Sequence, residues 1–113
     1  MAERVQGVIE LMRRDPGRDF TLAEMAASAN LSRPYFCYLF KSMTGSPPRR
    51  YLKLLRLQYA ATLLTTTFLT VKDVVERAGC ADQSHFVRDF KQMYGKTPSA
   101  YRNGALKSSE PRE

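Results

Sequence analysis

The chain has 113 residues, 43% of them hydrophobic, which is enough to bury one modest core or two small cores side by side. The formal net charge is +7, and no aspartate or glutamate occurs between Glu24 and Asp73. This pattern indicates a polyanionic partner, most often nucleic acid, with an ordinary solvated face as the alternative. The uncharged stretch over residues 57–71 is shorter than the roughly 20 apolar residues of a membrane helix, so we expect a soluble chain that spans no membrane.

The N-terminal part of the chain predicts two helices. Apolar residues recur there at helical spacing: Val5, Val8, Ile9 and Met12. They predict an amphipathic helix from about residue 3 to residue 13, which ends at the sequence DPG. Thr21 and Glu24 then have the spacing of a capping box, so a short second helix is expected over residues 22–28.

A tight turn and a longer third helix follow. Ser32 is a good N-cap, and Pro34 lies in the first helical turn, where its missing N–H does no harm. The helix is expected to end at Gly45. A short helix, a turn and a longer helix have the outline of a helix-turn-helix unit, although many helical hairpins share it.

The middle of the chain predicts one long helix over residues 48–65. Its expected buried stripe consists of Leu52, Leu55, Tyr59 and Leu63. At about 1.5 Å per residue, the helix is a rod of roughly 27 Å. On one face of B-DNA, successive stretches of the major groove lie about 34 Å apart. A rod of this length could therefore hold two DNA-contacting helices one turn of the DNA apart.

The second half of the chain repeats the first. Thr70 begins a short helix that Gly79 ends, and Asp82 caps a longer helix that Gly95 ends. Residues 36–51 and 86–101 align without a gap and share seven identities. The apolar positions of the earlier part, Leu22, Met25, Ala26 and Leu31, recur as Val71, Val74, Val75 and Cys80. The turn of the second copy has one extra residue. Two DNA-contacting units on one chain, each binding one half of a DNA site, would explain the repeat.

Residues 79–102, GCADQSHFVRDFKQMYGKTPSAYR, resemble the signature of the AraC/XylS family of transcription regulators, and the resemblance extends over about residues 3–102. It implies an all-α fold of about seven helices, in which a central linker helix joins two helix-turn-helix subdomains. The expected boundaries are 1–45 for the first subdomain, 46–67 for the linker, 68–105 for the second subdomain and 106–113 for a flexible tail. The implied function is sequence-specific binding of double-stranded DNA by a bacterial transcription regulator; an activator is expected, and repression stays open as the alternative. The chain departs from the family pattern at Cys80, where phenylalanine is usual, and at Val75, where a small residue is usual; both departures concern core packing.

Each longer helix of the two copies, called a reading helix below, is predicted to have a core face and an outward face. The expected core faces consist of Phe36, Leu39, Phe40 and Met43 in the first and Phe86, Phe90 and Met93 in the second. The expected base-reading residues are Arg33, Pro34, Cys37 and Tyr38 in the first and Gln83, Ser84, Val87 and Arg88 in the second. Arg88 can pair with guanine and Gln83 with adenine. The first helix has no such pair, so its apolar residues suggest contact with thymine methyls or shape reading, with Arg33 as its only strong donor.

Other polar residues are expected to contact phosphate, which sets register without reading sequence. They are Ser32, Lys41, Arg49, Arg50, Lys91 and Arg102. For each basic residue the alternative is a solvated charge. For Arg56, inside the linker helix, burial beside a carboxylate or carbonyl is an alternative to DNA contact.

Other functional classes find less support. His85 is the only histidine, and it has no nucleophile and base set around it, so we expect no enzyme and interpret it as a structural or edge residue. Cys37 and Cys80 lack metal-ligand spacing, so we expect reduced thiols in the cytoplasm, no metal and no cofactor. A thiol sensor or alkyl acceptor at Cys37 and a helical protein-interaction module without DNA affinity stay open as alternatives.

The expected partners are double-stranded DNA and RNA polymerase. Family members often carry an effector-sensing and dimerising domain ahead of this region. The chain is therefore either a stand-alone regulator or an excised domain, and the closeness of Met1 to the first helix favours the second interpretation. We expect a monomer in this form, with dimerisation through a missing N-terminal domain as the alternative.

Overall fold

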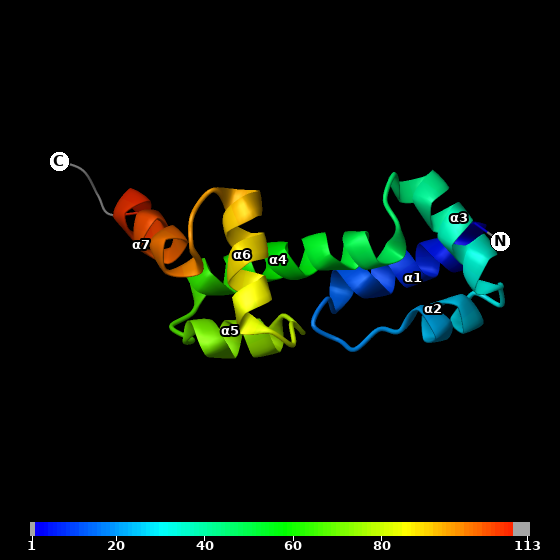
Figure 1. The fold of residues 1–113 in the computed structure, drawn as a ribbon, viewed down its shortest axis with the longest axis horizontal. Helices are drawn as coiled ribbons and strands as arrows, with labels where there is room; N and C mark the ends of the chain where they lie inside the picture. Colours follow the sequence, from blue (N-terminus) through cyan, green and yellow to red (C-terminus); the bar gives the residue numbers. More distant parts are fainter. Residues whose placement is uncertain (1, 110–113) are drawn as a thin grey trace. The chain divides into compact units, whose positions relative to one another are not determined.

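The computed structural model describes the backbone of residues 2–109 and the side chains of residues 2–105. This part of the chain forms seven α-helices and no strand, as predicted (Figure 1). The helices are α1 (Ala2–Arg14), α2 (Leu22–Ser28), α3 (Arg33–Thr44), α4 (Pro48–Thr66), α5 (Val71–Arg77), α6 (Gln83–Tyr94) and α7 (Pro98–Ser109). The chain divides into two compact units, one ending at Leu55 and the other beginning at Arg56, so α4 contributes residues to both.

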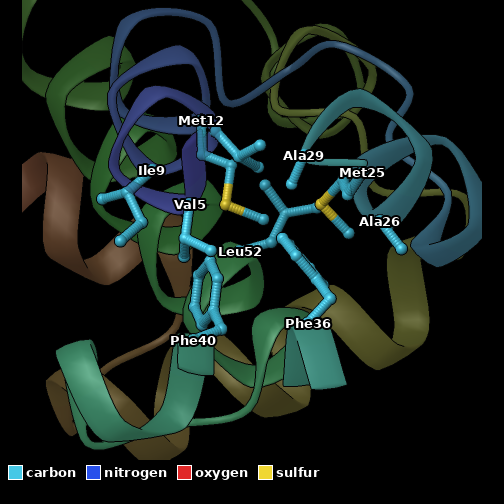
Figure 2. Packing of buried hydrophobic residues seen from close by; sticks show 10 residues of the cluster. Val5, Ile9, Met12, Met25, Ala26, Ala29, Phe36, Phe40 and Leu52 are labelled. Atoms are coloured by element: carbon cyan, nitrogen blue, oxygen red, sulfur yellow. The ribbon is translucent and has the colours of Figure 1, made fainter. Parts of the chain in front are cut away.

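The first unit packs α1, α2 and α3 around one apolar cluster. Figure 2 shows side chains from these helices pointing toward one another, together with Leu52 from the start of α4. The four apolar residues whose spacing predicted α1 are all buried, and so are Phe36 and Phe40 of α3. Leu39 and Leu55 are partly buried against the cluster. The predicted core faces of α1 and α3 are thus largely confirmed.

Local capping explains where the helices of the first unit begin and end. The Thr21 Oγ1 accepts a hydrogen bond from the Glu24 backbone N–H at 3.1 Å, and the Ser32 Oγ accepts one from the Tyr35 N–H at 3.3 Å. Each bond satisfies a donor that has no partner within the helix. Gly45 ends α3 with a φ of +83°, a left-handed conformation that residues with a Cβ rarely adopt.

The second unit repeats this arrangement with α5, α6 and α7. Thr70 Oγ1 accepts from the Asp73 N–H at 3.1 Å, and Gly95 ends α6 with a φ of +75°. Helix α5 ends at Arg77 with Ala78 as its C-cap, and Gly79 follows with a φ of +79°, in keeping with the glycine expected to end this helix. The buried residues of this cluster are Leu57, Ala60, Ala61, Leu63, Leu64, Val74, Val75, Ala78, Phe86 and Phe90. Val75 and the half-buried Cys80, where the chain departs from the family pattern, both pack here.

The repeat is also visible in the aromatic contacts within each unit. Phe40 meets Tyr51 edge to face, with ring centroids 5.3 Å apart, and Phe90 meets Tyr101 edge to face at the same 5.3 Å. Edge-to-face contact is favourable because the positive ring edge meets the negative ring face. These pairs hold each reading helix against the start of the next helix. The residues that are identical in the two copies therefore include some that pack the core.

Three predictions about packing need correction. Met43 and Met93 are both 38% exposed and belong to neither cluster, because they lie in the last turn of their helices, where the core has ended. The predicted stripe of α4 omitted Leu57, Ala60, Ala61 and Leu64, which are buried in the second cluster. Helix α7 runs to Ser109, four residues into the stretch predicted as a tail, and residues 110–113 lie outside the described residues.

A search of the described residues finds no helix that is both long enough and apolar enough to cross a membrane. The longest helix, α4, has 19 residues, and arginines and lysine are spread along its first half.

Candidate nucleic-acid interface

The predicted base-reading residues of the first copy lie together on the N-terminal half of α3. Arg33, Pro34 and Tyr38 are exposed, and Cys37 is half-buried. Pro34 takes a first-turn position, where its fixed φ suits the helix and no backbone donor is lost. The cap formed by Ser32 holds this turn in place. The exposed side of the N-terminal half of α3 therefore has Arg33 as its only cationic side chain.

The predicted base-reading residues of the second copy lie at the matching end of α6. Gln83, Ser84 and Arg88 are exposed, as predicted. Val87 was expected to point outward, but it is half-buried and packs against the second cluster. Part of the Val87 side chain is covered because Val87 lies next to the buried Phe86, so it has less surface to offer a ligand than the sequence suggested.

The N-terminus of α6 has a stronger cap than that of α3. The Asp82 Oδ1 accepts from the Ser84 N–H at 2.8 Å and from the His85 N–H at 3.2 Å. The bond from His85 is the largest cause that holds the pKa of the Asp82 carboxyl below its usual value, because hydrogen bonding favours the charged form. An ionised carboxylate at this position also suits the positive end of the helix dipole.

Tyr35 was missed as a candidate in the sequence. Its side chain is 41% exposed and stacks on Tyr38, with ring centroids 6.2 Å apart and an interplanar angle of 12°. The signal that could have revealed it is the spacing of three residues, which brings two aromatic rings together on one side of a helix. At the matching position of α6 stands His85, which is also exposed, as an edge residue would be.

Most of the predicted phosphate contacts are available at the surface. Lys41 and Lys91 are exposed at matching positions of α3 and α6. Arg49 and Arg50 are exposed in the first turn of α4, where no acidic residue accompanies them. Ser32 is exposed, but its hydroxyl oxygen already accepts the capping bond of α3.

Arg102 has a structural role in place of the predicted phosphate contact. Its Nε donates to the Leu64 carbonyl at 2.9 Å, and its Nη2 donates to the Thr67 carbonyl at 3.3 Å. Both carbonyls lie at the C-terminal end of α4, where helix carbonyls have no intrahelical partner. The guanidinium therefore caps α4 from α7, and we leave Arg102 out of the proposed DNA contacts.

The two cysteines are free and half-buried. Burial raises the pKa of the Cys80 thiol, a shift that Arg56 opposes and Asp89 reinforces. A raised pKa keeps this thiol protonated and unreactive at neutral pH. Among the side chains of residues 2–105, no three from histidine, cysteine, aspartate or glutamate gather closely enough to hold a metal ion.

Comparison with known families and structures decides what these two copies form. A family model described as a helix-turn-helix domain matches residues 25–104. The chain belongs to this family. It is a helix-turn-helix domain of the AraC type, as the signature in residues 79–102 implied.

Individual proteins of this family are similar over nearly the whole chain. The transcriptional activator NphR of a Rhodococcus species is 42% identical over 99 residues, which cover 88% of this chain and 29% of NphR. The DNA-binding domain of the global transcriptional factor AdpA, solved with a target DNA, is 28% identical with a TM-score of 0.89 and covers 94% of this chain and 96% of its own. A probable AraC family regulator from Rhodopseudomonas palustris is 28% identical with a TM-score of 0.81, covering 91% and 97%. The chain spans about a third of the length of the curated relatives that it matches.

Proposed function

We propose that this helix-turn-helix domain is the sequence-specific DNA-binding part of a bacterial transcription regulator. In this proposal α3 and α6 are its two reading helices, and they enter adjacent major-groove segments of one duplex. The observation that carries the proposal is a repeated unit: in both copies a capped helix buries two phenylalanines in its own core and exposes the other side of its N-terminal half. The similarity to a domain that was solved with its target DNA supports it.

The exposed side chains suggest separate roles within this interface. Arg88 has the donors to grip the O6 and N7 atoms of guanine, and Gln83 can pair with the N6 and N7 atoms of adenine. Lys41 and Lys91 would contact phosphate, as would Arg49 and Arg50. The absence of acidic residues between Glu24 and Asp73 supports the same ligand, because a polyanion is attracted to this part of the chain.

The organisation and partners follow from the same proposal. We assign residues 1–45 and 68–105 to the two helix-turn-helix subdomains and residues 46–67 to the linker. NphR is named a transcriptional activator, which favours activation and RNA polymerase as the protein partner. One chain carries two reading helices, so it can bind DNA as a monomer. Binding to the DNA of a bacterium would place the protein in the cytoplasm, and membership in a family of DNA-binding regulators favours a role other than enzymatic catalysis.

The experiment that tests this function compares two exposed residues of α6. A preferred site is selected from random duplexes, and affinities for this site and a scrambled duplex are measured at several salt concentrations. Arg88→Ala should weaken the preferred site by about 1 to 3 kcal/mol and flatten the preference at one or two base pairs. Lys91→Ala should weaken both duplexes about equally and reduce the slope of log K against log salt by about one unit.

Two outcomes would count against the proposal. If no duplex binds even at low salt while a protein partner is retained, the chain is a helical protein-interaction module. If Arg88→Ala weakens both duplexes equally and the preference survives, Arg88 contacts phosphate and the assigned reader is wrong. Circular dichroism of both variants serves as the control for folding, because Arg88 and Lys91 are exposed and neither belongs to the core.

A further inference from the structure

The outward faces of the two reading helices carry different chemistry at matching positions. In the fifty-residue repeat, Tyr35 of α3 corresponds to His85 of α6, and Tyr38 corresponds to Arg88. All four side chains are exposed. Helix α6 therefore offers hydrogen-bonding groups where α3 offers two aromatic rings, and the two helices are suited to different bases.

The two rings of α3 form one ordered apolar surface. Tyr38 is 65% exposed and Tyr35 is 41% exposed, and the nearly parallel rings stack at 6.2 Å. Neither ring belongs to the hydrophobic cluster of the first unit, so neither is needed to fill the core. Because the rings restrain each other before any ligand binds, less side-chain entropy is lost when a ligand contacts them.

Apart from the two tyrosine hydroxyls, the same end of α3 has few groups that could hydrogen-bond to bases. Pro34 has no N–H, and the Tyr35 N–H already donates to the Ser32 cap. Arg33 stands at the first position of the helix, and no arginine, asparagine or glutamine occupies its exposed middle. In the major groove, the apolar group that a base pair presents is the 5-methyl group of thymine. The ring faces of Tyr35 and Tyr38 match that group, and their hydroxyls are polar groups of a different kind.

We propose that α3 selects thymines by contact between their 5-methyl groups and the stacked rings of Tyr35 and Tyr38. Helix α6 selects its half of the site by hydrogen bonds. This inference rests on the proposed DNA-binding function and specifies the substrate of one reading helix. It also separates methyl contact from shape reading, the two possibilities that the sequence left for this helix.

The test uses uracil, which lacks the 5-methyl group of thymine but keeps all of its hydrogen-bonding groups. In the selected site, the half read by α6 is marked by the base pairs whose preference Arg88→Ala flattens. Each thymine of the other half is replaced singly by uracil, and the affinity is measured by fluorescence anisotropy at fixed salt. Removal of one contacted methyl should weaken binding about fourfold.

Variants of Tyr38 assign the effect to the ring. At the thymine that Tyr38 contacts, the uracil and thymine duplexes should bind equally well in Tyr38→Ala, whereas in Tyr38→Phe the preference for thymine should persist because the ring remains. Arg88→Ala is the matched control on α6, and it should keep the fourfold uracil effect although its overall affinity is lower. Tyr38 is largely exposed, so the variants should fold, which thermal melts will check.

Three results would overturn the inference. The first is a selected site with no thymine in the half that Arg88→Ala leaves unchanged. The second is an unchanged affinity on uracil replacement at all of these thymines, which would indicate shape reading. The third is an equal loss in Tyr38→Phe and Tyr38→Ala, which would indicate a hydroxyl contact with phosphate. In all three cases the duplex is still bound with sequence preference, so the proposed function stands; absence of duplex binding would overturn both.

Discussion

The paired phenylalanines of the reading helices are among the largest fully buried side chains. Phe40 and Phe90 are fully buried, and each contacts a second phenylalanine and a tyrosine. Because these rings fill the centre of each unit, they link the end of a reading helix to the helix that follows it. Residues that face outward on the same helices, such as Tyr38 and Arg88, have no part in this packing.

Truncation of these rings should therefore lower stability and affect DNA binding only through unfolding. We expect Phe40→Ala and Phe90→Ala each to lower the free energy of unfolding by about 3 to 5 kcal/mol, because each leaves a cavity that the unit can fill only in part. Urea denaturation followed by circular dichroism measures the change. The exposed Tyr38→Ala is the control, with an expected change within about 0.5 kcal/mol. A Phe40→Ala chain as stable as the natural one would show that the core face is assigned wrongly.

At the scale of single helices, α6 depends on a charged cap. The backbone bonds from His85 and Ser84 lower the pKa of the Asp82 carboxyl below its usual 3.8. The unfolded chain lacks these bonds, so the cap stabilises the fold fully above pH 3.8, and its contribution is lost as the pH falls through the lower folded pKa. Ser32, the cap of α3, does not titrate in this range.

The cap of α6 should thus contribute a measurable acid dependence. In Asp82→Asn an amide oxygen can still accept a backbone bond, but it has no proton to gain in this range. We expect the stability difference between the natural chain and Asp82→Asn to shrink as the pH is lowered from about 5 to about 2.5. Urea midpoints of both chains across this range measure it. A difference that stays constant with pH would mean that the carboxylate does not cap α6 in solution.

The C-terminal end of α4 depends on a residue from another helix. Arg102 of α7 donates to the carbonyls of Leu64, in the last turn of α4, and Thr67, the residue after it. Arg50, at the other end of α4, is exposed and has neither of these bonds. The two arginines therefore offer a matched pair for separating structural and DNA-binding roles.

Substitution of these arginines should affect different quantities. Arg102→Ala should lower the free energy of unfolding by about 1 to 3 kcal/mol, because it leaves helix carbonyls without a charged donor. It should not change the slope of log K against log salt. Arg50→Ala should leave stability within about 0.5 kcal/mol and reduce that slope by about one unit. Thermal melts and salt titrations of both variants test this, and a reduced slope for Arg102→Ala would restore the phosphate contact that the sequence suggested.

At the scale of the whole molecule, the duplication of the helix-turn-helix unit predicts the stoichiometry of DNA binding. Symmetric dimers supply two reading helices from two chains, whereas this chain contains both. We expect one chain to bind one short duplex that holds both half-sites, and analytical ultracentrifugation of the complex measures this. A duplex with one half-site scrambled is the control, and it should bind more weakly with the same stoichiometry. Two chains per duplex at every mixing ratio would contradict the single-chain interpretation.

The sequence by itself determined the features that depend on neighbouring residues. Thr21, Ser32 and Asp82 act as caps within three residues of their partners, and Gly45 and Gly95 end their helices through their own backbone freedom. Helical spacing was enough to identify Phe36, Phe40, Phe86 and Phe90 as core, because a repeat of 3.6 residues defines a face. The resemblance of residues 79–102 to the family signature then predicted how these helices are arranged in a fold.

Only the tertiary structure decided which members of a helical face are covered. Met43 and Met93 share the spacing of the core but lie where the core has ended, and Val87 packs inward although its spacing suggested an outward side chain. Arg102 is equally basic in either role, and its role became clear from carbonyls that lie 35 and 38 residues away in the sequence. The physical reason is the same in each case: burial and hydrogen-bond partners depend on what the other helices bring near a side chain, and local spacing carries no record of that.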